Sequence, residues 1–156
     1  MRITLVSVGT KMPGWIQHGV EEYGKRIKGS LGFSLTEIPL AQRGKSANTM
    51  QSVEKEGKAI LAKVQKNDFV IALEVEGTRL STGEMARRLE EFKTLGQNIV
   101  FVSGGPDGLH ASCRERANEQ WSLSDLTLPH PLVRIILVEQ LYRATSLLEG
   151  HPYHRE

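Results

Sequence analysis

The sequence predicts an α/β fold, in which a mostly parallel sheet has helices on both faces. Short apolar runs of strand length alternate along the whole chain with longer segments of helical length, as in domains where strands and helices follow one another in turn. Two of these runs, FVIALE and IVFVS, are compact and apolar and indicate buried strands. The chain has 156 residues, which is enough for a full hydrophobic core, and we expect residues 1–156 to form a single domain.

The N-terminal third is predicted to contain two strands around one helix. The run Ile3–Val8 has the length of a strand, and the glycine and proline of residues 9–13 turn the chain after it. Gly14–Lys28 suits a helix, and Phe33–Ile38 alternates apolar and polar residues as a strand does. A polar, basic loop is expected over Pro39–Ala47.

The middle of the chain is predicted to contain a buried strand between two helices. Asn48 can cap a helix that runs to about Gln65, and the strand is Phe69–Glu74. The tetrapeptide Ser81-Thr82-Gly83-Glu84 has the spacing of a capping box, so the second helix begins there and runs to about Thr94.

The last third is predicted to end in one long helix. A strand at Ile99–Ser103 comes first, followed by a short helix over 110–119 and a short strand at Trp121–Leu123. The final helix covers about Pro131–Leu148, and residues 149–156 form a tail.

The composition excludes several classes of protein. No apolar run approaches the roughly 20 residues of a membrane-spanning helix, and no secretory leader is recognisable, so we expect a cytoplasmic protein without a membrane partner. Cys113 is the only cysteine, which excludes an intrachain disulfide and a cysteine-based metal cluster. The histidines lack a ligand spacing on one element, and we expect no metal.

Positive charge is concentrated near the N-terminus. Residues 1–50 contain seven Lys and Arg against three Asp and Glu, whereas the remainder of the chain is net negative. A mildly basic segment fits an anionic partner such as RNA, and it fits ordinary solvated lysines equally well. The candidates for phosphate contacts are Lys11, Lys25, Arg26, Lys28, Arg43 and Lys45.

Three loops are candidate binding segments, because ligands of open α/β sheets bind beyond the carboxyl ends of the strands. They are Val75–Leu80, Gly104–Leu109 and Ser124–His130. The glycines of Gly104-Gly105-Pro106-Asp107-Gly108 either let the backbone approach a ligand or form a tight turn. This segment lacks the G-x-G-x-x-G and Walker patterns, which argues against a dinucleotide or triphosphate.

The third loop is rich in leucine and ends in a histidine between two prolines. Leu123, Leu126 and Leu128 could line an apolar slot for a flat ring such as adenine, or they could belong to the core. His130 lies at or near the N-terminus of the last helix, where the helix dipole disfavours its protonation. A neutral imidazole at this place can donate or accept a hydrogen bond, act as a base, or only cap the helix.

The last helix and the tail carry two further signals. The helix is apolar on more than one side, so it is buried either against a second subunit as well as its own core or in the centre of one chain. The tail contains Tyr153, His154 and Arg155, a combination that can stack on a base and contact phosphate, although tails are commonly disordered.

Several motifs carry a resemblance to a known family. They are Gly9-Thr10-Lys11, Gly104-Gly105-Pro106-Asp107-Gly108, Trp121–Ser124 with Leu126–His130, Arg134 with Glu139, Tyr142-Arg143-Ala144 and Tyr153-His154-Arg155. Together they resemble the ribosomal RNA large subunit methyltransferase H family, small bacterial enzymes of the SPOUT class. The resemblance covers the whole chain, and its most specific parts are Trp121 to Ala144 and the tail.

The resemblance implies a fold, a cofactor and a substrate. The C-terminal part of the sheet is tucked through a loop as a deep trefoil knot, the knot loops bind S-adenosylmethionine, and the protein is a homodimer. The implied substrate is a pseudouridine (1915 in the family's name) in the helix 69 loop of 23S rRNA, methylated at N3 on the assembled 70S ribosome. The implied cofactor-binding positions are Leu73, Gly104, Gly105, Leu123, Ser124, Asp125, Leu126, Thr127 and Leu128.

The catalytic candidates follow from the same resemblance and from the chemistry. Tyr153, His154 and Arg155 match the family's tail, which completes the active site, by implication that of the partner subunit. The N3 proton must be lost before N3 attacks a methyl group, so a base is expected. We hypothesise that His154 or His130 is this base, that Arg155 stabilises the developing oxyanion or a phosphate, and that Tyr153 stacks on the pseudouridine.

Two rival functions remain at this stage. One is a nucleotide-binding α/β hydrolase or dehydrogenase, against which the missing motifs argue. The other is a non-catalytic ribosome-binding factor with a vestigial cofactor site.

Overall fold

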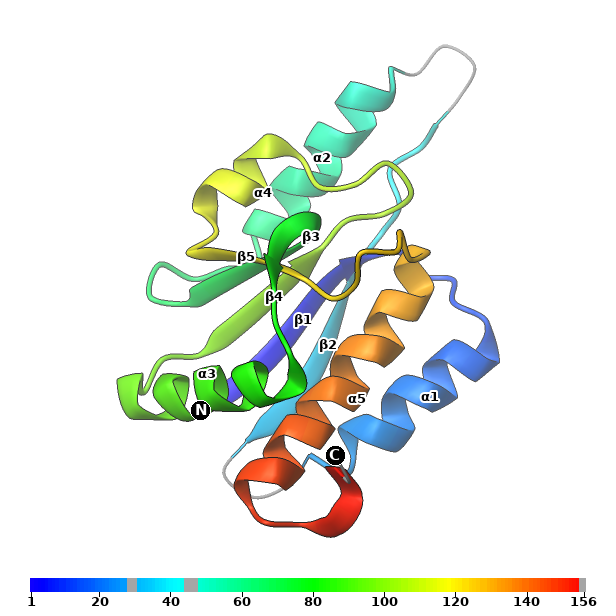
Figure 1. Ribbon diagram of the computed structural model, residues 1–156. Helices are drawn as coiled ribbons and strands as arrows, with labels where there is room; N and C mark the ends of the chain where they lie inside the picture. The colour runs from blue at the N-terminus through cyan, green and yellow to red at the C-terminus, as the bar shows by residue number, and fades with distance from the viewer. Residues whose placement is uncertain (28–30, 44–47, 155–156) are drawn as a thin grey trace.

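Five strands form one parallel sheet in the computed structural model, which describes residues 1–27, 31–43 and 48–154 (Figure 1). The strands lie in the order β2-β1-β4-β3-β5, and every neighbouring pair is parallel. Their bounds are β1 Arg2–Val8, β2 Gly32–Ile38, β3 Phe69–Arg79, β4 Ile99–Ser103 and β5 Glu119–Ser122. The predicted α/β class is confirmed.

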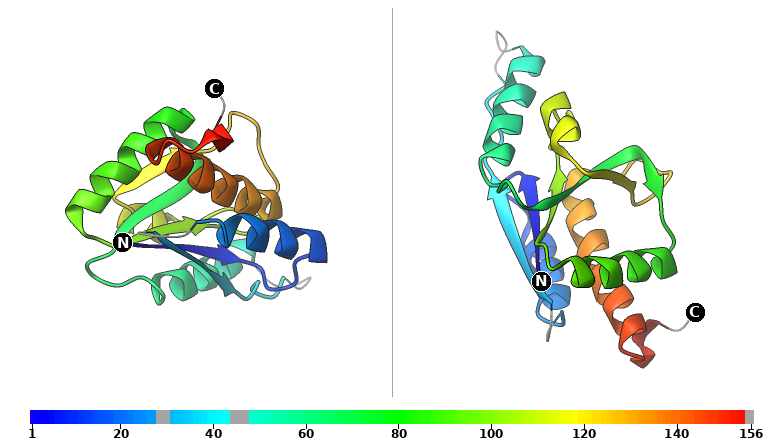
Figure 2. Two further views of the ribbon diagram at one scale, coloured as in Figure 1. Left: turned by 90° about the horizontal axis from the view of Figure 1, so that it is seen from below. Right: turned by 90° about the vertical axis from the view of Figure 1, so that its left-hand side faces the viewer.

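Helices cover both faces of this sheet, as predicted (Figure 2). Their bounds are α1 Gly14–Gly24, α2 Thr49–Leu61, α3 Thr82–Leu95, α4 Ala111–Arg116 and α5 His130–Leu148, and a short 3₁₀ helix, η1, spans Pro152–His154. On one face, α1, α3 and α5 enclose a buried cluster that includes Phe92, Phe101 and Leu137. On the other face, α2 and α4 pack Ile60 and Cys113 against the sheet.

Three helix starts show why the chain changes direction where it does. The Asn48 side chain accepts a hydrogen bond from the backbone N–H of Met50 at 2.9 Å, so it caps α2 as predicted. Both halves of the predicted capping box form, because Ser81 Oγ accepts from the N–H of Glu84 at 3.1 Å and the Glu84 carboxylate accepts from the N–H of Ser81 at 2.7 Å. α5 begins one residue earlier than predicted, at His130.

Two helices are shorter than predicted because the chain tightens after them. α1 ends at Gly24 rather than Lys28, and α2 ends at Leu61 rather than Gln65. Beyond these ends the backbone continues with i to i+3 hydrogen bonds, as from the N–H of Ile27 to the carbonyl of Gly24 at 3.2 Å. The short helix and the short strand before α5 also differ from the predicted bounds, and they lie at Ala111–Arg116 and Glu119–Ser122.

The second half of β3 is the largest departure from prediction. Val75–Leu80 was expected to be a loop, and this was wrong, because β3 continues to Arg79. Leu73 pairs with Trp121, and Thr78 pairs with the same residue after an irregularity in the register. The sequence of this segment does not alternate between apolar and polar residues as a half-buried strand does. It becomes a strand because Thr78 and Arg79 pair with the backbone of β5.

α5 is the central helix of its face. It packs between α1 and α3, and it buries Leu137, Leu141 and Ala144 completely (Figure 1). Burial inside its own chain therefore explains much of its apolar character, whereas a second subunit against it and the C-terminal knot stay predictions. α5 has 19 residues, and no helix within the described ranges is long and apolar enough to cross a membrane.

Candidate active site

A cleft of about 460 Å³ opens beside the middle of β3 and the ends of β4 and β5. Four segments line it: the middle of β3, the loop after β4, the segment between β5 and α5, and the first turn of α5. A mainly apolar cleft of this size is typical of small-molecule sites. The predicted residues that line the cleft are Leu73, Gly104, Gly105, Leu123, Ser124, Leu126, Thr127, Leu128 and His130.

The loop after β4 has a shape that its glycines require. The N–H of Gly108 donates to the carbonyl of Gly105 at 3.1 Å, which closes a turn, and Gly108 has a φ of +82°. A Cβ on Gly104 would lie 2.4 Å from the carbonyl carbon of Gly108. The loop is thus folded tightly on itself and also turns bare backbone toward the cleft, so the two alternatives for its glycines both hold.

Two short-range hydrogen bonds fix the backbone of the leucine-rich segment between β5 and α5. Ser122 Oγ donates to the carbonyl of Ser124 at 2.9 Å, and Ser124 Oγ accepts from the N–H of Leu126 at 3.0 Å. Leu126 is 73% exposed, so the interpretation of this leucine as a core residue was wrong. Leu123 lines the cleft and also packs against the core cluster beneath it.

Asp125 differs from its neighbours in the same segment, because it is not among the residues that line the cleft. Its carboxylate accepts a hydrogen bond from Arg79 Nη1 at 2.9 Å, and both side chains are exposed. Asp125 therefore joins the end of β3 to the segment before α5 at the rim of the cleft.

His130 stands at the first position of α5 and lines the cleft. Burial, followed by the positive charge of Arg134, lowers the pKa of its imidazole, which is therefore neutral at neutral pH. Its Nδ1 is buried and has no hydrogen-bond partner within the described part of the chain. A neutral ring with a free nitrogen beside a ligand cleft can act as a proton acceptor.

Arg134 lies one turn further along α5 and is 1% exposed. Its Nη2 donates to the carbonyl of Gly9 at 2.7 Å, and its Nη1 donates to Glu37 at 2.7 Å. These bonds tie the start of α5 to the ends of β1 and β2, next to His130.

The tail lies against the second half of α5, and Tyr153 is not among the residues that line the cleft. The Tyr153 hydroxyl donates to Glu139 at 3.1 Å, and its ring centroid is 4.5 Å from that of Tyr142. Burial and the Glu139 carboxylate raise the pKa of the Tyr153 phenol to about 12. His154 closes η1, and the structure describes its backbone only, whereas Arg155 lies outside the described residues.

The basic candidates for phosphate contacts separate into three groups. Lys11 is exposed, and Lys25 and Arg26 share the carboxylate of Glu22 on the surface of α1. Arg43 is mostly buried and engaged by two carboxylates. Lys28 and Lys45 lie outside the described residues.

The sequence analysis missed one charged residue of the cleft. Glu74 follows Leu73 and lines the wall, and its carboxylate accepts from Arg114 Nη1 at 3.3 Å. The same Arg114 nitrogen donates to the carbonyl of Leu109, another wall residue, at 2.7 Å. The sequence signal was present, because Glu74 is the last residue of the apolar run FVIALE and a carboxylate is out of place in a buried strand.

A family model described as "Predicted SPOUT methyltransferase" matches residues 1–154. A protein of Hahella chejuensis named "Ribosomal RNA large subunit methyltransferase H" is 51% identical over 156 residues, which is 100% of both chains. The chain belongs to the ribosomal RNA large subunit methyltransferase H family. A relative of the same name from Saccharophagus degradans is 48% identical and covers 99% of this chain and 100% of its own length. The protein is therefore a methyltransferase of the SPOUT class, and the resemblance seen in the sequence is confirmed.

Solved structures that are much more distant share the fold. A probable methyltransferase from Bordetella pertussis has a TM-score of 0.53 at 15% identity, over 91% of this chain and 95% of that chain. A probable methylase family protein from Haemophilus influenzae has a TM-score of 0.54 at 15% identity, over 99% of this chain and 70% of that one.

Proposed function

We propose that this member of the family transfers a methyl group from S-adenosylmethionine to N3 of a pseudouridine in the helix 69 loop of 23S rRNA. The proposed substrate is the assembled 70S ribosome in the cytoplasm, and the proposed enzyme is a homodimer. The observation that carries the proposal is the cleft beside the middle of β3 and the ends of β4 and β5, because it is lined by the segments that match the family's cofactor positions. The names of the full-length relatives support large-subunit rRNA as the substrate class.

The cleft residues fit S-adenosylmethionine chemically. Apolar side chains, including Leu73, Leu123 and Leu128, suit the faces of an adenine ring, and the bare backbone at Gly104 and Gly105 can reach its polar edges. The ligand carries positive charge on its sulfonium and its amino group, and Glu74 places a carboxylate on the wall. We infer that these residues, together with Ser124, Leu126 and Thr127, hold the cofactor, with Asp125 at the rim.

The residues around the cleft would supply what a methyl transfer needs from the protein. The bound cofactor supplies a methyl group that is already activated on sulfur. The walls exclude water and align the acceptor, and a base accepts the N3 proton, a step that contributes about 10²–10⁴-fold in rate. His130 is one candidate for the base because it is neutral, lines the cleft and has an unpartnered Nδ1. His154 is the other.

We infer that the tail completes the cleft of the partner subunit. Tyr153 contacts Glu139, which is nine residues beyond His130 in α5, or about 14 Å along a helix axis. A tail docked in this way does not reach the cleft of its own subunit. Two antiparallel copies of α5 across a twofold axis would bring each tail to the other cleft, where Tyr153 would stack on the target base and Arg155 would stabilise its charge.

The test is transfer of tritiated methyl from S-adenosylmethionine to 70S ribosomes purified from a strain that lacks this gene. Free 50S subunits and protein-free 23S rRNA are assayed alongside. We expect label in 70S ribosomes that maps to one pseudouridine of helix 69. Label at another nucleotide would refute the proposed target, and absence of label in all three substrates would refute the activity.

Binding measurements separate the remaining alternative, a non-catalytic ribosome-binding factor. We expect the protein to bind S-adenosylmethionine in a calorimetric titration and to bind 70S ribosomes in a sedimentation assay. Ribosome binding without cofactor binding would favour the non-catalytic factor.

A further inference from the structure

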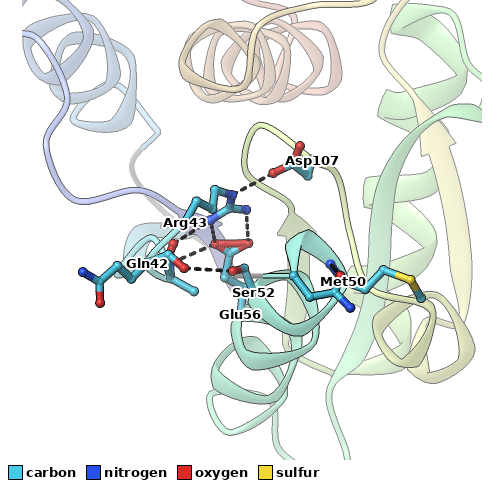
Figure 3. A network of polar contacts seen from close by, with 8 residues as sticks. Gln42, Arg43, Met50, Ser52, Glu56 and Asp107 are labelled. Atoms are coloured by element: carbon cyan, nitrogen blue, oxygen red, sulfur yellow. Dashed lines mark hydrogen bonds and ion pairs between the residues drawn. The ribbon is translucent and has the colours of Figure 1, made fainter. Parts of the chain in front are cut away.

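A half-buried arginine bridges three segments, one of which is the glycine loop after β4 (Figure 3). Arg43 follows β2, Glu56 lies on α2, and Asp107 lies in the loop after β4. Arg43 donates from Nη1 and Nη2 to the two oxygens of Glu56, at 2.9 Å each, and from Nε to Asp107 at 2.7 Å. One guanidinium thus joins two carboxylates that are 51 residues apart in the sequence.

The Glu56 end of this bridge is fixed. The Glu56 side chain is 2% exposed, and it also accepts a hydrogen bond from the N–H of Ala41 at 3.0 Å. Arg43 Nη1 donates in addition to the carbonyl of Ala41 at 2.8 Å, and Ser52 on α2 donates to the carbonyl of Gln42 at 2.9 Å. Because a buried carboxylate is costly without its partner, α2 determines where the guanidinium lies.

The Asp107 end of the bridge holds the cleft loop. Gly104, Gly105, Pro106 and Gly108 line the cleft, whereas Asp107 is not among the lining residues and points to Arg43 (Figure 3). Asp107 occupies the third position of the turn that the Gly105–Gly108 hydrogen bond closes. The Asp107 carboxylate therefore attaches this turn to Arg43.

We propose that Arg43 is a positioning residue for the cofactor, because through Asp107 it holds the Gly104–Gly108 loop in the shape that receives S-adenosylmethionine. The inference rests on the proposed function of the cleft. Three of the five loop residues are glycine, which loses more backbone freedom on ordering than any other residue. The Arg43–Asp107 ion pair, here called the tether, restricts the loop before the ligand binds. It therefore strengthens binding without contacting the ligand.

This role differs from the one that the sequence suggested for Arg43. A basic residue in a polar loop was a candidate for a phosphate contact. In the structure its guanidinium instead pairs with Glu56 and Asp107, so its charge stabilises contacts within the chain.

The test uses Asp107→Asn, which removes the charge at constant size and leaves the Arg43–Glu56 pair in place. We expect the dissociation constant for S-adenosylmethionine to rise about three- to fivefold, the scale of one partly exposed ion pair. Hydrogen exchange of the backbone amides of residues 104–109 should accelerate, whereas exchange in α2 should not change. Asp107→Glu, which restores the carboxylate, should recover most of the affinity.

The matched control is Glu54→Gln, which removes an exposed carboxylate from α2 where it pairs with Lys58 at 3.4 Å. It should alter neither affinity nor exchange. Wild-type affinity and exchange in Asp107→Asn would overturn the tether, and so would faster exchange spread over the whole chain, which would indicate a general loss of stability. If the wild-type protein binds no cofactor, the proposed function is refuted. The tether can still be tested in that case, because hydrogen exchange of the loop is measured without a ligand.

Discussion

At the scale of single residues, His130 is the group whose surroundings are most unusual. It is partly buried at the first position of a helix, a cation lies near it, and its Nδ1 is unpartnered in the described structure. Burial and Arg134 both disfavour the protonated ring, and both lower its pKa. The site therefore keeps an imidazole in the form that can take a proton.

The pH dependence of the reaction follows from this lowered pKa. A base works only when it is unprotonated, so a pKa below the ordinary 6.5 extends activity further into the acid range. We expect kcat/KM for 70S ribosomes to stay constant from neutral pH to below 6.5 and then to fall. His130→Asn should abolish this fall at acid pH (the acid limb of the profile) and lower kcat by about 100-fold or more.

The matching variant is His154→Asn, measured in the same pH series. The two variants together distinguish the two candidate bases. Near-native turnover in both, with cofactor binding intact, would exclude both histidines as the base and would indicate a water or the RNA itself.

Arg134 offers a second prediction at this scale. Arg134→Met removes a buried cation and its bonds to the carbonyl of Gly9 and to Glu37, which leaves a buried carbonyl without its donor and should destabilise the protein by about 1–3 kcal/mol. The loss of positive charge should also raise the pKa of His130, because Arg134 lowers it in the native protein. The acid limb of the rate should then move to higher pH.

Arg134→Lys is the control for the electrostatic part of this prediction. It keeps the charge and loses the forked hydrogen bonds, so stability should fall while the pKa of His130 stays low. An NMR titration of the His130 ring measures this pKa directly. An unchanged pKa in Arg134→Met would show that burial alone sets the protonation of His130.

At the scale of elements, the cleft depends on segments that turn tightly after their strands. The loop after β4 leaves no room for a side chain at Gly104, and β3 approaches the backbone of β5 closely at Gly77, where a Cβ would lie 2.7 Å from the carbonyl carbon of Trp121. The backbone at Gly104 cannot shift without moving a wall of the cleft. Both positions therefore require glycine, because a side chain at either one would collide with neighbouring backbone.

Gly104→Ala tests this condition. The new methyl group would collide with the carbonyl carbon of Gly108 at 2.4 Å, so we expect a loss of about 1–3 kcal/mol in unfolding free energy and a weaker affinity for S-adenosylmethionine. Gly83→Ala in α3 is the control, because its Cβ would meet only Ser81 Oγ at 3.9 Å and alanine favours a helix. Chemical denaturation and a cofactor titration measure both effects, and equal behaviour of the two variants would contradict the prediction.

At the scale of the whole molecule, the residues that we propose for the site lie at the two ends of α5. The cleft contains His130 at the start of the helix, and Tyr153 contacts its second half. If the tail contributes to catalysis, as we propose, a second copy of the chain in which the helix runs the other way completes the site. The proposed homodimer follows from this separation.

Mixing two inactive variants tests the division. His130→Asn damages the cleft, and a double variant with Tyr153→Ala and His154→Ala damages the tail. If each tail serves the other cleft, subunit exchange makes one intact site in every mixed dimer, and about a quarter of the wild-type activity should return in an equal mixture. A tail that serves its own cleft would restore none.

Much of this architecture could be predicted from local sequence. The order of strands and helices, the caps at Asn48 and Ser81 and two of the three candidate loops depend on apolar runs, hydrogen-bonding side chains and glycines that act within a few residues. The local pattern of Leu123–His130 left a binding slot and a core segment open, the resemblance to the family assigned it to the cofactor site, and most of it lines the cleft. The strand beyond Glu74 was missed because its stability comes from β5, which is distant in the sequence.

The sequence by itself determined the α/β class, the family and the segments that surround the cleft, because these depend on patterns that are written locally along the chain. Only the tertiary structure decided what each polar group faces. It paired Arg43 with Glu56 and Asp107, left His130 without a partner for its Nδ1, and set Tyr153 against Glu139. Such pairings join residues from separate elements, and burial rather than sequence distance determines their strength.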